Sequence, residues 1–289
     1  MTQIIALAGN KLSGKTTASN FLHGHVLKLN EVIRHFDILH DGKLQVNTQY
    51  LKDGEVKDDM GELDLTRTDD LFTGYAGEKI WPYIKMYNFA EALKEICGSL
   101  FGLTHEQLHG TEKNSVTKLR WENMPGVITP EKAMNFGQGN DLWNVGYIPA
   151  IEDLASIFEE IAIVHEPGFM TSREVLQFVG TEIFRKMYEP VWVNLLINRI
   201  KEESPMIAVI ADCRFDNEAQ GVKDAGGTVV KLTRQTEVDN HQSERGFDKF
   251  DDFDKVVDNK NMSIKECNQS ILDFLIQKGI SELVNKGEM

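Results

Sequence analysis

The sequence predicts an α/β fold in which helices cover both faces of a parallel sheet, giving three layers. Three short runs, residues 3–8, 206–211 and 228–232, are largely apolar, which is typical of strands buried on both faces. Helix-forming segments alternate with these runs. This alternation predicts strand–helix–strand units with right-handed crossovers.

The first strand, residues 3–8, leads into a predicted helix from Lys15 to Val26, where good helix formers follow one another without proline. Residues 28–85 then interrupt the pattern. Asp-Gly pairs at 41–42 and 53–54 are turn signals, and charged residues break any core period. We therefore expect residues 28–85 to be an insertion with a β-hairpin, on the substrate side or as a lid.

Helices in the rest of the chain are predicted from capping boxes, from Pro190 and from apolar periodicity. They cover residues 88–101, a short segment from 104, and residues 151–163, 171–187, 190–200, 217–225 and 263–285, with a last strand at 256–257. We find no internal repeat and expect residues 1–289 to form a single domain.

Charge and cysteine content exclude several classes of protein. The 289 residues carry 31 Lys and Arg against 45 Asp and Glu, a net charge of −14, so we expect neither nucleic acid nor a membrane surface as a partner. The three cysteines lie far apart in the sequence, which argues against a disulfide framework. The sequence shows no signal peptide and no apolar run of the ~18 residues that a membrane span needs. These features predict a cytoplasmic protein.

Residues 9–16, GNKLSGKT, match the phosphate-loop pattern. In such a loop, backbone N–H groups curl around a polyphosphate and the following helix N-terminus adds partial positive charge. The pattern predicts that Lys15 reaches the β- and γ-phosphates and that the hydroxyl of Thr16 ligates Mg²⁺. An ordinary glycine turn is the alternative, but a strand before the motif and a helix after it favour the phosphate loop. The residues predicted to hold the triphosphate are Gly9, Asn10, Ser13, Gly14, Lys15 and Thr16.

The predicted helix over residues 171–187 has an apolar stripe and a polar stripe. The polar stripe, at i, i+4 steps, consists of Arg173, Gln177, Thr181 and Arg185, with Gly180 beside them. These side chains could bind a second phosphate and read a base edge, but a solvated helix face explains the pattern equally well. Trp192 in the next helix could stack on a base, although tryptophan is more usually a core residue.

Asp212 and Arg214 follow the apolar run 206–211. Ligands of open α/β sheets bind at the carboxyl ends of the strands, where Asp212 could hold the metal or its water and Arg214 could neutralise a transferring phosphoryl group. A helix-capping Asp212 with a surface arginine is an equally good interpretation.

Residues 105–109, HEQLH, match a zinc-protease pattern. We discount it, because the predicted helix is short and meets Gly110 directly after the second histidine. The extended pattern also fails, since Glu112 and Ser115 occupy the positions of its glycine and third histidine.

Several blocks together resemble the deoxynucleoside monophosphate kinases of tailed bacteriophages. The two longest blocks are residues 173–181, REVLQFVGT, and residues 212–218, DCRFDNE. Shorter blocks are residues 13–17, 89–90, 93–94, 101–104, 118–121, 192–193, 226–227 and 241–244. Together they cover about two-thirds of the chain in order, so the joint pattern is far more specific than the phosphate loop.

This resemblance implies a fold of the phosphate-loop kinase type and an enzyme that uses ATP and Mg²⁺ to phosphorylate deoxynucleoside 5′-monophosphates. It implies catalytic roles for Lys15, Arg173 and Arg214, with Thr17 added to the ATP-binding residues and Asp212 beside Thr16 at the metal. The acceptor-binding residues that it implies are Phe89, Arg120, Arg173, Gln177, Gly180, Thr181, Trp192, Asp212 and Glu218. Small-molecule nucleotides are the implied partners, a homodimer is allowed, and a phage-encoded enzyme would act in the host cytoplasm.

Two departures limit the transfer. Several relatives carry aspartate in place of Thr16, which puts the detail of metal binding in doubt, and residues 28–85 match only loosely. Three alternatives therefore stay open: a ribonucleotide or coenzyme-precursor kinase, a non-catalytic ATP-binding module, and, least favoured, a zinc hydrolase.

Overall fold

The computed structural model describes residues 2–52, 55–138, 162–234, 247 and 249–284. Two compact units make up the chain. Unit 1 comprises Met1–Glu91 and Pro190–Met289, and unit 2 comprises Ala92–Glu189. Each unit has its own hydrophobic core and is described by itself.

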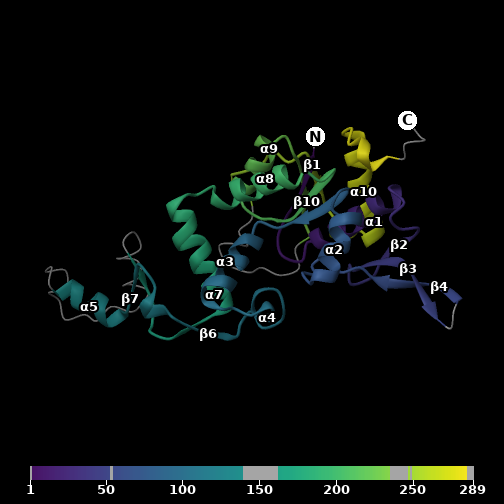
Figure 1. Ribbon diagram of the computed structural model, residues 1–289. Helices are drawn as coiled ribbons and strands as arrows, with labels where there is room; N and C mark the ends of the chain where they lie inside the picture. The colour runs from purple at the N-terminus through teal and green to yellow at the C-terminus, as the bar shows by residue number, and fades with distance from the viewer. Residues whose placement is uncertain (1, 53–54, 139–161, 235–246, 248, 285–289) are drawn as a thin grey trace. The chain divides into compact units, whose positions relative to one another are not determined.

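Unit 1 contains a five-stranded parallel sheet with the strand order β12-β11-β1-β10-β5. Figure 1 labels two of its strands, β1 and β10. The strands are β1 (Gln3–Ala8), β5 (Ile84–Tyr87), β10 (Ile207–Cys213), β11 (Thr228–Leu232) and β12 (Lys255–Val257). The strand that precedes the phosphate-loop motif, β1, is central, with β10 and β11 as neighbours. The predicted parallel sheet is confirmed.

Alternation along the strands builds two hydrophobic cores, one on each face of this sheet. Ile5 and Leu7 of β1 pack with α1 (Lys15–Leu29) and α10 (Ile264–Gln277). Their neighbours Ile4 and Ala6 pack on the opposite face with α8 (Val191–Glu203) and α9 (Asp216–Asp224). Successive side chains of a strand point to opposite faces, so a wholly apolar strand requires helices on both. The three-layer prediction is therefore confirmed.

The edge strand β5 was not predicted. Its polar residues are involved in contacts with α8: the ammonium of Lys85 lies 2.7 Å from a carboxylate oxygen of Glu203, and the hydroxyl of Tyr87 donates to the same carboxylate at 2.6 Å. A short edge strand has one neighbour and tolerates such polar side chains, so it lacks the apolar run that marks β1 and β10.

The stretch between α1 and β5 forms a three-stranded antiparallel sheet followed by a helix. Its strands are β2 (Phe36–Ile38), β3 (Leu44–Lys52) and β4 (Glu55–Glu62). The predicted hairpin is confirmed, but helix α2 (Asp70–Lys79), capped by the side chain of Asp69, was not predicted. Leu44 and Val46 of β3 pack into the same core as α1.

Unit 2 is built from short elements around a core that includes Cys97, Met170, Val175 and Phe178. In chain order they are α3 (Glu91–Phe101), which begins at the end of unit 1, α4 (His105–Leu108), β6 (Val116–Arg120), η1 (Trp121–Asn123), β7 (Val127–Ile128), α5 (Pro130–Gln138), β8 (Ile163–Val164), β9 (Phe169–Thr171), α7 (Ser172–Gln177) and η2 (Phe178–Arg185). Most of the helix predicted over 151–163 lies outside the described residues.

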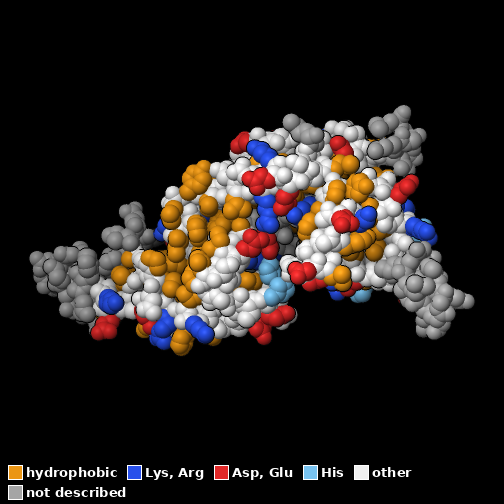
Figure 2. Space-filling model, viewed as in Figure 1, with side chains coloured by type: hydrophobic (Ala, Val, Ile, Leu, Met, Phe, Trp, Pro, Cys, Tyr) orange, Lys and Arg blue, Asp and Glu red, His pale blue; other side chains and the backbone are white. Residues whose placement is uncertain are grey.

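The prediction of one α-helix over residues 171–187 is wrong in its second half. The capping box formed by Thr171 and Glu174 opens α7 as expected, but η2 is a π-helix. Hydrogen bonds of a π-helix run from i to i+5, so an i, i+4 stripe does not continue straight through it. Figure 2 shows hydrophobic side chains gathered over η2, and Met187 just beyond it is 78% exposed.

The C-terminal helix is shorter than the predicted 263–285. α10 begins after the capping residue Ser263 as expected but ends at Gln277, and Gly279 adopts a φ of +93° that an α-helix cannot continue. Among the described residues, no helix is long and apolar enough to span a membrane.

Candidate nucleotide-binding site

The phosphate-loop motif forms a tight turn between β1 and α1. Gly9 has a φ of +141°, and a Cβ there would lie 2.4 Å from the carbonyl oxygen of Leu232. Gly14, with a φ of +99°, is the N-cap residue of α1. Both glycines are required, the first for a close backbone approach and the second for a left-handed conformation. The loop thus places the N-terminus of α1 at the carboxyl end of β1.

Lys15 is the buried cation of this loop, with 6% of its surface exposed. Its Nζ donates to the carbonyl oxygens of Gly9 and Asn10, both at 2.6 Å, and lies 3.4 Å from Oγ of Ser13. Thr16, the next residue, is exposed. The loop backbone therefore holds the ammonium where oxygen acceptors converge, as a phosphate-binding lysine requires.

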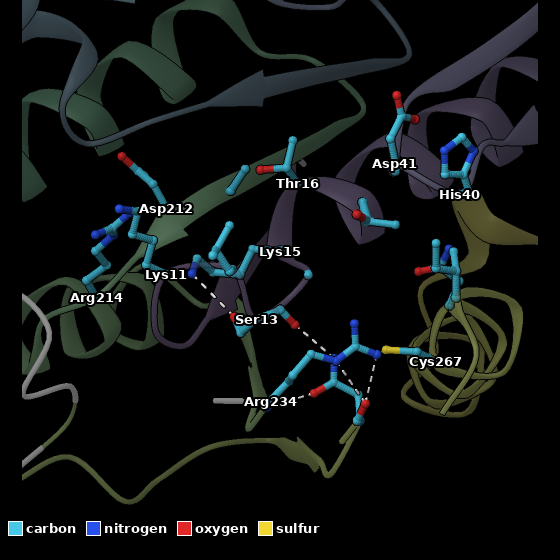
Figure 3. Close-up of a pocket in the computed structure, with 18 of the residues that line it drawn as sticks. Lys11, Ser13, Lys15, Thr16, His40, Asp41, Asp212, Arg214, Arg234 and Cys267 are labelled. Carbon is cyan, nitrogen blue, oxygen red and sulfur yellow. Dashed lines mark hydrogen bonds between the residues drawn. The ribbon is translucent and has the colours of Figure 1, made fainter. Parts of the chain in front are cut away.

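A cavity of about 530 Å³ opens over this loop, with all of its lining in unit 1 (Figure 3). This volume is within the range of small-molecule sites. Lys11, Asp212 and Arg214 lie on one side in Figure 3, and His40, Asp41 and Cys267 lie on the other. The charged side chains of the lining are Lys11, Lys15, Arg214, Arg234, Asp41 and Asp212. Basic groups outnumber acidic ones among these described residues, which favours an anionic ligand.

Asp212 has contacts that bear on both interpretations of this residue, and its role at a metal stays a prediction. It lines the cavity, and its carboxylate oxygens also accept the backbone N–H groups of Phe89 at 2.8 Å and Ala90 at 3.3 Å, just before α3. Arg214 lines the same cavity and is half-buried. Burial raises the pKa of Cys213 between them, so this cysteine is a packing residue and not a ready nucleophile.

Glu218 holds the backbone that carries Arg214. Its side chain is 2% exposed, and Oε2 accepts the N–H groups of Arg214 at 2.9 Å and Phe215 at 3.2 Å. The implied role of Glu218 in substrate binding stays a prediction, and the observed contacts indicate a positioning role.

The turn between β2 and β3 also lines the cavity, which was not predicted. Gly42 has a φ of +86°, and a Cβ there would lie 2.2 Å from Oγ1 of Thr17. Nδ2 of Asn20 donates to the carbonyl oxygen of Gly42 at 2.9 Å. The Asp41-Gly42 signal predicted the turn, but its docking on α1 depends on tertiary packing.

Arg234, Asn259, Cys267 and Asn268, which also line the cavity, were missed as well. They lie after the carboxyl ends of β11 and β12 or at the start of α10, where the strand-end rule applies. That rule was applied to β10 alone.

The predicted acceptor-binding residues of unit 2 lie in several environments. Arg173 is exposed, and its Nε donates to Oδ1 of Asn114 at 3.1 Å. Arg120 pairs with Glu122 and lies over the ring of Phe169, 4.6 Å from its centroid.

Gln177 in unit 2 is half-buried, and Thr181 is exposed. Gly180 is buried, and a Cβ there would lie 2.7 Å from Cδ2 of Leu93. Because glycine has no Cβ, the side chain of Leu93 in α3 can pack directly against this position. The implied acceptor roles of these residues stay predictions.

Two aromatic candidates are buried in unit 1. Phe89 is 5% exposed and packs in the core on the α8 and α9 side of the sheet, and Trp192 is 4% exposed. Trp192 is therefore buried, as tryptophan usually is, and its implied place in the nucleoside pocket stays a prediction. The 241–244 motif lies outside the described residues.

The HEQLH segment forms a single four-residue helix, α4, capped by Thr104. The rings of His105 and His109 stack with centroids 4.8 Å apart, and Nζ of Lys94 lies 3.3 Å from Nδ1 of His109. Within the described part of the chain, no group of three or more His, Cys, Asp and Glu side chains is arranged to hold a metal ion. An ammonium beside the imidazole also disfavours a cation there.

The donor set of the cavity fits Mg²⁺ bound together with a nucleotide. Mg²⁺ usually takes one or two protein oxygen ligands and fills its other positions with phosphate oxygens and water. Thr16 presents an exposed hydroxyl, and Asp212 presents a carboxylate to the same cavity.

Comparison with known proteins points in one direction. A family model described as deoxynucleotide monophosphate kinase matches residues 3–271. The deoxynucleoside-5′-monophosphate kinase of Escherichia phage T5 is 29% identical over 152 residues, which are 47% of this chain and 57% of the phage protein. A protein of Acanthamoeba polyphaga mimivirus, named for deoxynucleotide monophosphate kinase activity, is 28% identical over 188 residues, which are 64% of this chain and 79% of the viral protein. The aligned part of the chain thus spans little more than half of the T5 kinase.

Proposed function

The chain belongs to the deoxynucleotide monophosphate kinase family, and on this premise we propose that it transfers the γ-phosphoryl group of ATP to a deoxynucleoside 5′-monophosphate. The main observation behind the proposal is the phosphate loop with Lys15 at its centre. The loop opens into a cavity of about 530 Å³, and basic side chains outnumber acidic ones among the described residues that line it. The products are ADP and the deoxynucleoside diphosphate.

Donor binding is assigned to the loop and to Lys15. Two carbonyl oxygens already hold the ammonium at 2.6 Å, so phosphate oxygens that enter the loop find the cation in place. The N–H groups at the start of α1 lack acceptors within the helix and are directed at the same ligand. An ammonium has three N–H donors, so phosphate oxygens would take over one or more of the contacts that Nζ makes with loop oxygens.

Thr16 and Asp212 are the residues that would hold Mg²⁺, Thr16 directly and Asp212 directly or through water. A bound Mg²⁺ would neutralise negative charge on the β- and γ-phosphate oxygens. Asp212 also accepts the N–H groups of Phe89 and Ala90, so its carboxylate is oriented by the backbone before any ligand binds.

Transfer needs no covalent intermediate on the protein. An oxygen of the acceptor monophosphate forms a bond to the γ-phosphorus, the bond between that phosphorus and the β–γ bridging oxygen breaks, and ADP leaves. We assign Arg214 to charge neutralisation during this step, since it is a cation in the donor cavity. Arg173 of unit 2 is assigned to the acceptor phosphate on the strength of the family blocks, with Gln177 and Thr181 on the nucleoside.

A panel of acceptors tests the proposal. The purified protein is incubated with ATP, Mg²⁺ and each deoxyribonucleoside or ribonucleoside monophosphate, and the diphosphate products are separated and quantified. The expected result is conversion of one or more deoxynucleoside monophosphates with much slower conversion of their ribonucleotide counterparts. Preference for a ribonucleotide would place the protein among other small-molecule kinases. Tight ATP binding with no accepted substrate would instead indicate a non-catalytic module.

A further inference from the structure

Asn259 is a buried polar residue whose side chain joins the phosphate loop to the other end of the chain. It lies between β12 and α10 and is 2% exposed. Its Nδ2 donates to the carbonyl oxygen of Ser13 at 2.8 Å, and its Oδ1 accepts the backbone N–H of Arg234 at 2.9 Å. One amide group therefore links the loop after β1 to the residues that follow β11.

Arg234 in turn fixes the segment that carries Asn259. Its Nε and Nη2 donate to the carbonyl oxygen of Asn259 at 3.2 and 3.0 Å, and Nη2 also donates to the carbonyl oxygen of Met262 at 3.1 Å. Figure 3 shows Ser13 and Arg234 close together in the cavity, with dashed hydrogen bonds around them. The position of the amide is thus set by several hydrogen bonds and by burial.

The contact with Ser13 controls the direction of a neighbouring donor. In a trans peptide, the carbonyl oxygen of one residue and the N–H of the next point in opposite directions. When Asn259 holds the carbonyl of Ser13, the N–H of Gly14 must point away from Asn259. Gly14 has a φ of +99° and is the N-cap residue of α1, so this peptide plane also sets the start of the helix.

We propose that Asn259 is a positioning residue for the ATP donor: it holds the Ser13–Gly14 peptide so that the loop keeps its phosphate-binding conformation. The residue acts through the loop backbone. Its replacement should therefore weaken the binding of ATP and leave the binding of the acceptor monophosphate unchanged. Neither the phosphate-loop pattern nor the blocks shared with the kinase family include Asn259. The inference rests on the proposed function in so far as ATP is the donor.

The Asn259→Asp variant separates the two hydrogen bonds. A carboxylate can still accept from the N–H of Arg234, but it cannot donate to the carbonyl of Ser13. The matched control is Asn30→Asp. Asn30 follows the other end of α1, where its Nδ2 donates to the carbonyl oxygen of Val26 at 2.8 Å, so the control loses the same kind of bond away from the loop.

Three measurements are made on the wild type and both variants: the dissociation constant of a fluorescent ATP analogue without acceptor, the KM values of ATP and of the acceptor, and the melting temperature. For N259D we expect about tenfold weaker donor binding and a matching rise in the KM of ATP. We expect the acceptor KM to stay within about twofold. For N30D we expect the dissociation constant of the ATP analogue and the KM of ATP each to stay within about twofold of the wild-type values.

A melting temperature lowered in both variants, with unchanged donor binding in N259D, would reduce Asn259 to a stabilising contact and overturn the inference. An equal rise of both KM values in N259D would overturn it too. Asn259→Ser is measured beside N259D, because its shorter side chain breaks the same link without adding a negative charge near the phosphates. Donor binding that weakens in N259D but not in N259S would be charge repulsion and would overturn the inference. If N259D is unfolded at the assay temperature, N259S alone is compared with the wild type for the changes in the KM of ATP and the KM of the acceptor. A wild type that binds the analogue without phosphorylating any acceptor contradicts the proposed function alone, since the binding measurement still tests Asn259.

Discussion

The phosphate loop of unit 1 and the α7–η2 helix of unit 2 are both predicted phosphate sites, but they depend on the sequence in different ways. In the loop, the donors are backbone N–H groups, and two glycines and one lysine determine their arrangement. In the helix, the predicted donors are side chains. Arg173 and Gln177 lie in the α-helical half, whereas Thr181 and Arg185 lie in the π-helix, where side-chain directions differ from those of an α-helix. The strand, the turn and the helix start that form the loop were predicted correctly, whereas the second helix changes type at Phe178.

This difference shows which kind of binding site can be predicted from a few neighbouring residues. The conformation of a phosphate loop depends on the backbone angles that its own residues allow. Gly9 and Gly14 supply two of the positive φ angles of this loop, and both lie within the motif. A side-chain site on a helix requires the correct periodicity over several turns, and a π-helix alters that periodicity without a clear sequence signal.

Replacing the loop lysine should have the largest effect. Lys15→Ala removes the ammonium held 2.6 Å from two loop carbonyls, and we expect kcat to fall about 10²–10³-fold while the fold persists. The readout is ADP release under saturating substrates, with circular dichroism to confirm folding. Lys43→Ala, at an exposed ion pair with Glu62, is the control and should keep normal kcat. Normal turnover in K15A would remove the loop from the mechanism.

The helix that follows the loop should be sensitive to acid. Burial lowers the pKa of His23 from 6.5 to about 4, although its Nδ1 donates to the carbonyl of Ser19 at 2.8 Å. Between pH 6.5 and 4 the unfolded chain binds a proton here that the folded chain does not, so the free energy of unfolding should fall as pH falls through this window. The loss attributable to His23 is about 3 kcal/mol and should be absent above pH 7.

Urea unfolding of the wild type and His23→Gln at pH 7 and pH 4.5 measures this effect. The glutamine variant should show a shallower loss than the wild type, although some loss persists because burial also lowers the pKa of His25. An equal loss in the free energy of unfolding from pH 7 to pH 4.5 for the two proteins would mean that His23 is protonated in the folded state at pH 4.5.

On the helix side, Arg173→Ala should raise the KM of the acceptor monophosphate about tenfold or more and change the KM of ATP by less than about twofold. Such a split would show that the α-helical half of the predicted stripe, which contains Arg173, binds the acceptor. Lys186→Ala, an exposed position at the end of η2, is the control. An equal rise for both substrates would reassign Arg173 to a structural role, consistent with its bond to Asn114.

The smallest effect is expected at Gly180. In Gly180→Ala the added Cβ would lie 2.7 Å from the tip of Leu93, a flexible side chain, so we expect a loss of about 1 kcal/mol in the free energy of unfolding. Gly74→Ala in α2 is the matched control. A Cβ at Gly74 meets no described atom within 4 Å, and alanine is the better helix former, so this change should stabilise by about 0.5–1 kcal/mol. A raised acceptor KM in G180A without any loss of stability would favour the predicted role of Gly180 in the nucleoside pocket.

The candidate site itself was only partly predictable. Lys15, Thr16, Asp212 and Arg214 follow strand ends or the loop motif, and all of them line one cavity. His40, Arg234 and Asn259 line the same cavity although no motif marks them. Arg234 and Asn259 follow strand ends, but which strand ends and which turn meet at the cavity depends on how they pack around α1. Glu218 was predicted from its family block, but only the structure shows its hydrogen bonds to the backbone of Arg214 and Phe215.

The parallel sheet, the helices on its two faces and the phosphate loop could be predicted from the sequence. Apolar runs, capping residues and glycines act over a few residues and therefore leave a local record. Tertiary structure alone decided the edge strand β5, the π-helical turn of η2 and the docking of Gly42 on Thr17. It also decided the bond from Asn259 to Ser13, which joins residues 246 positions apart. Such features arise when segments far apart in the sequence pack together. A pattern of a few residues does not show which distant segments will be in contact.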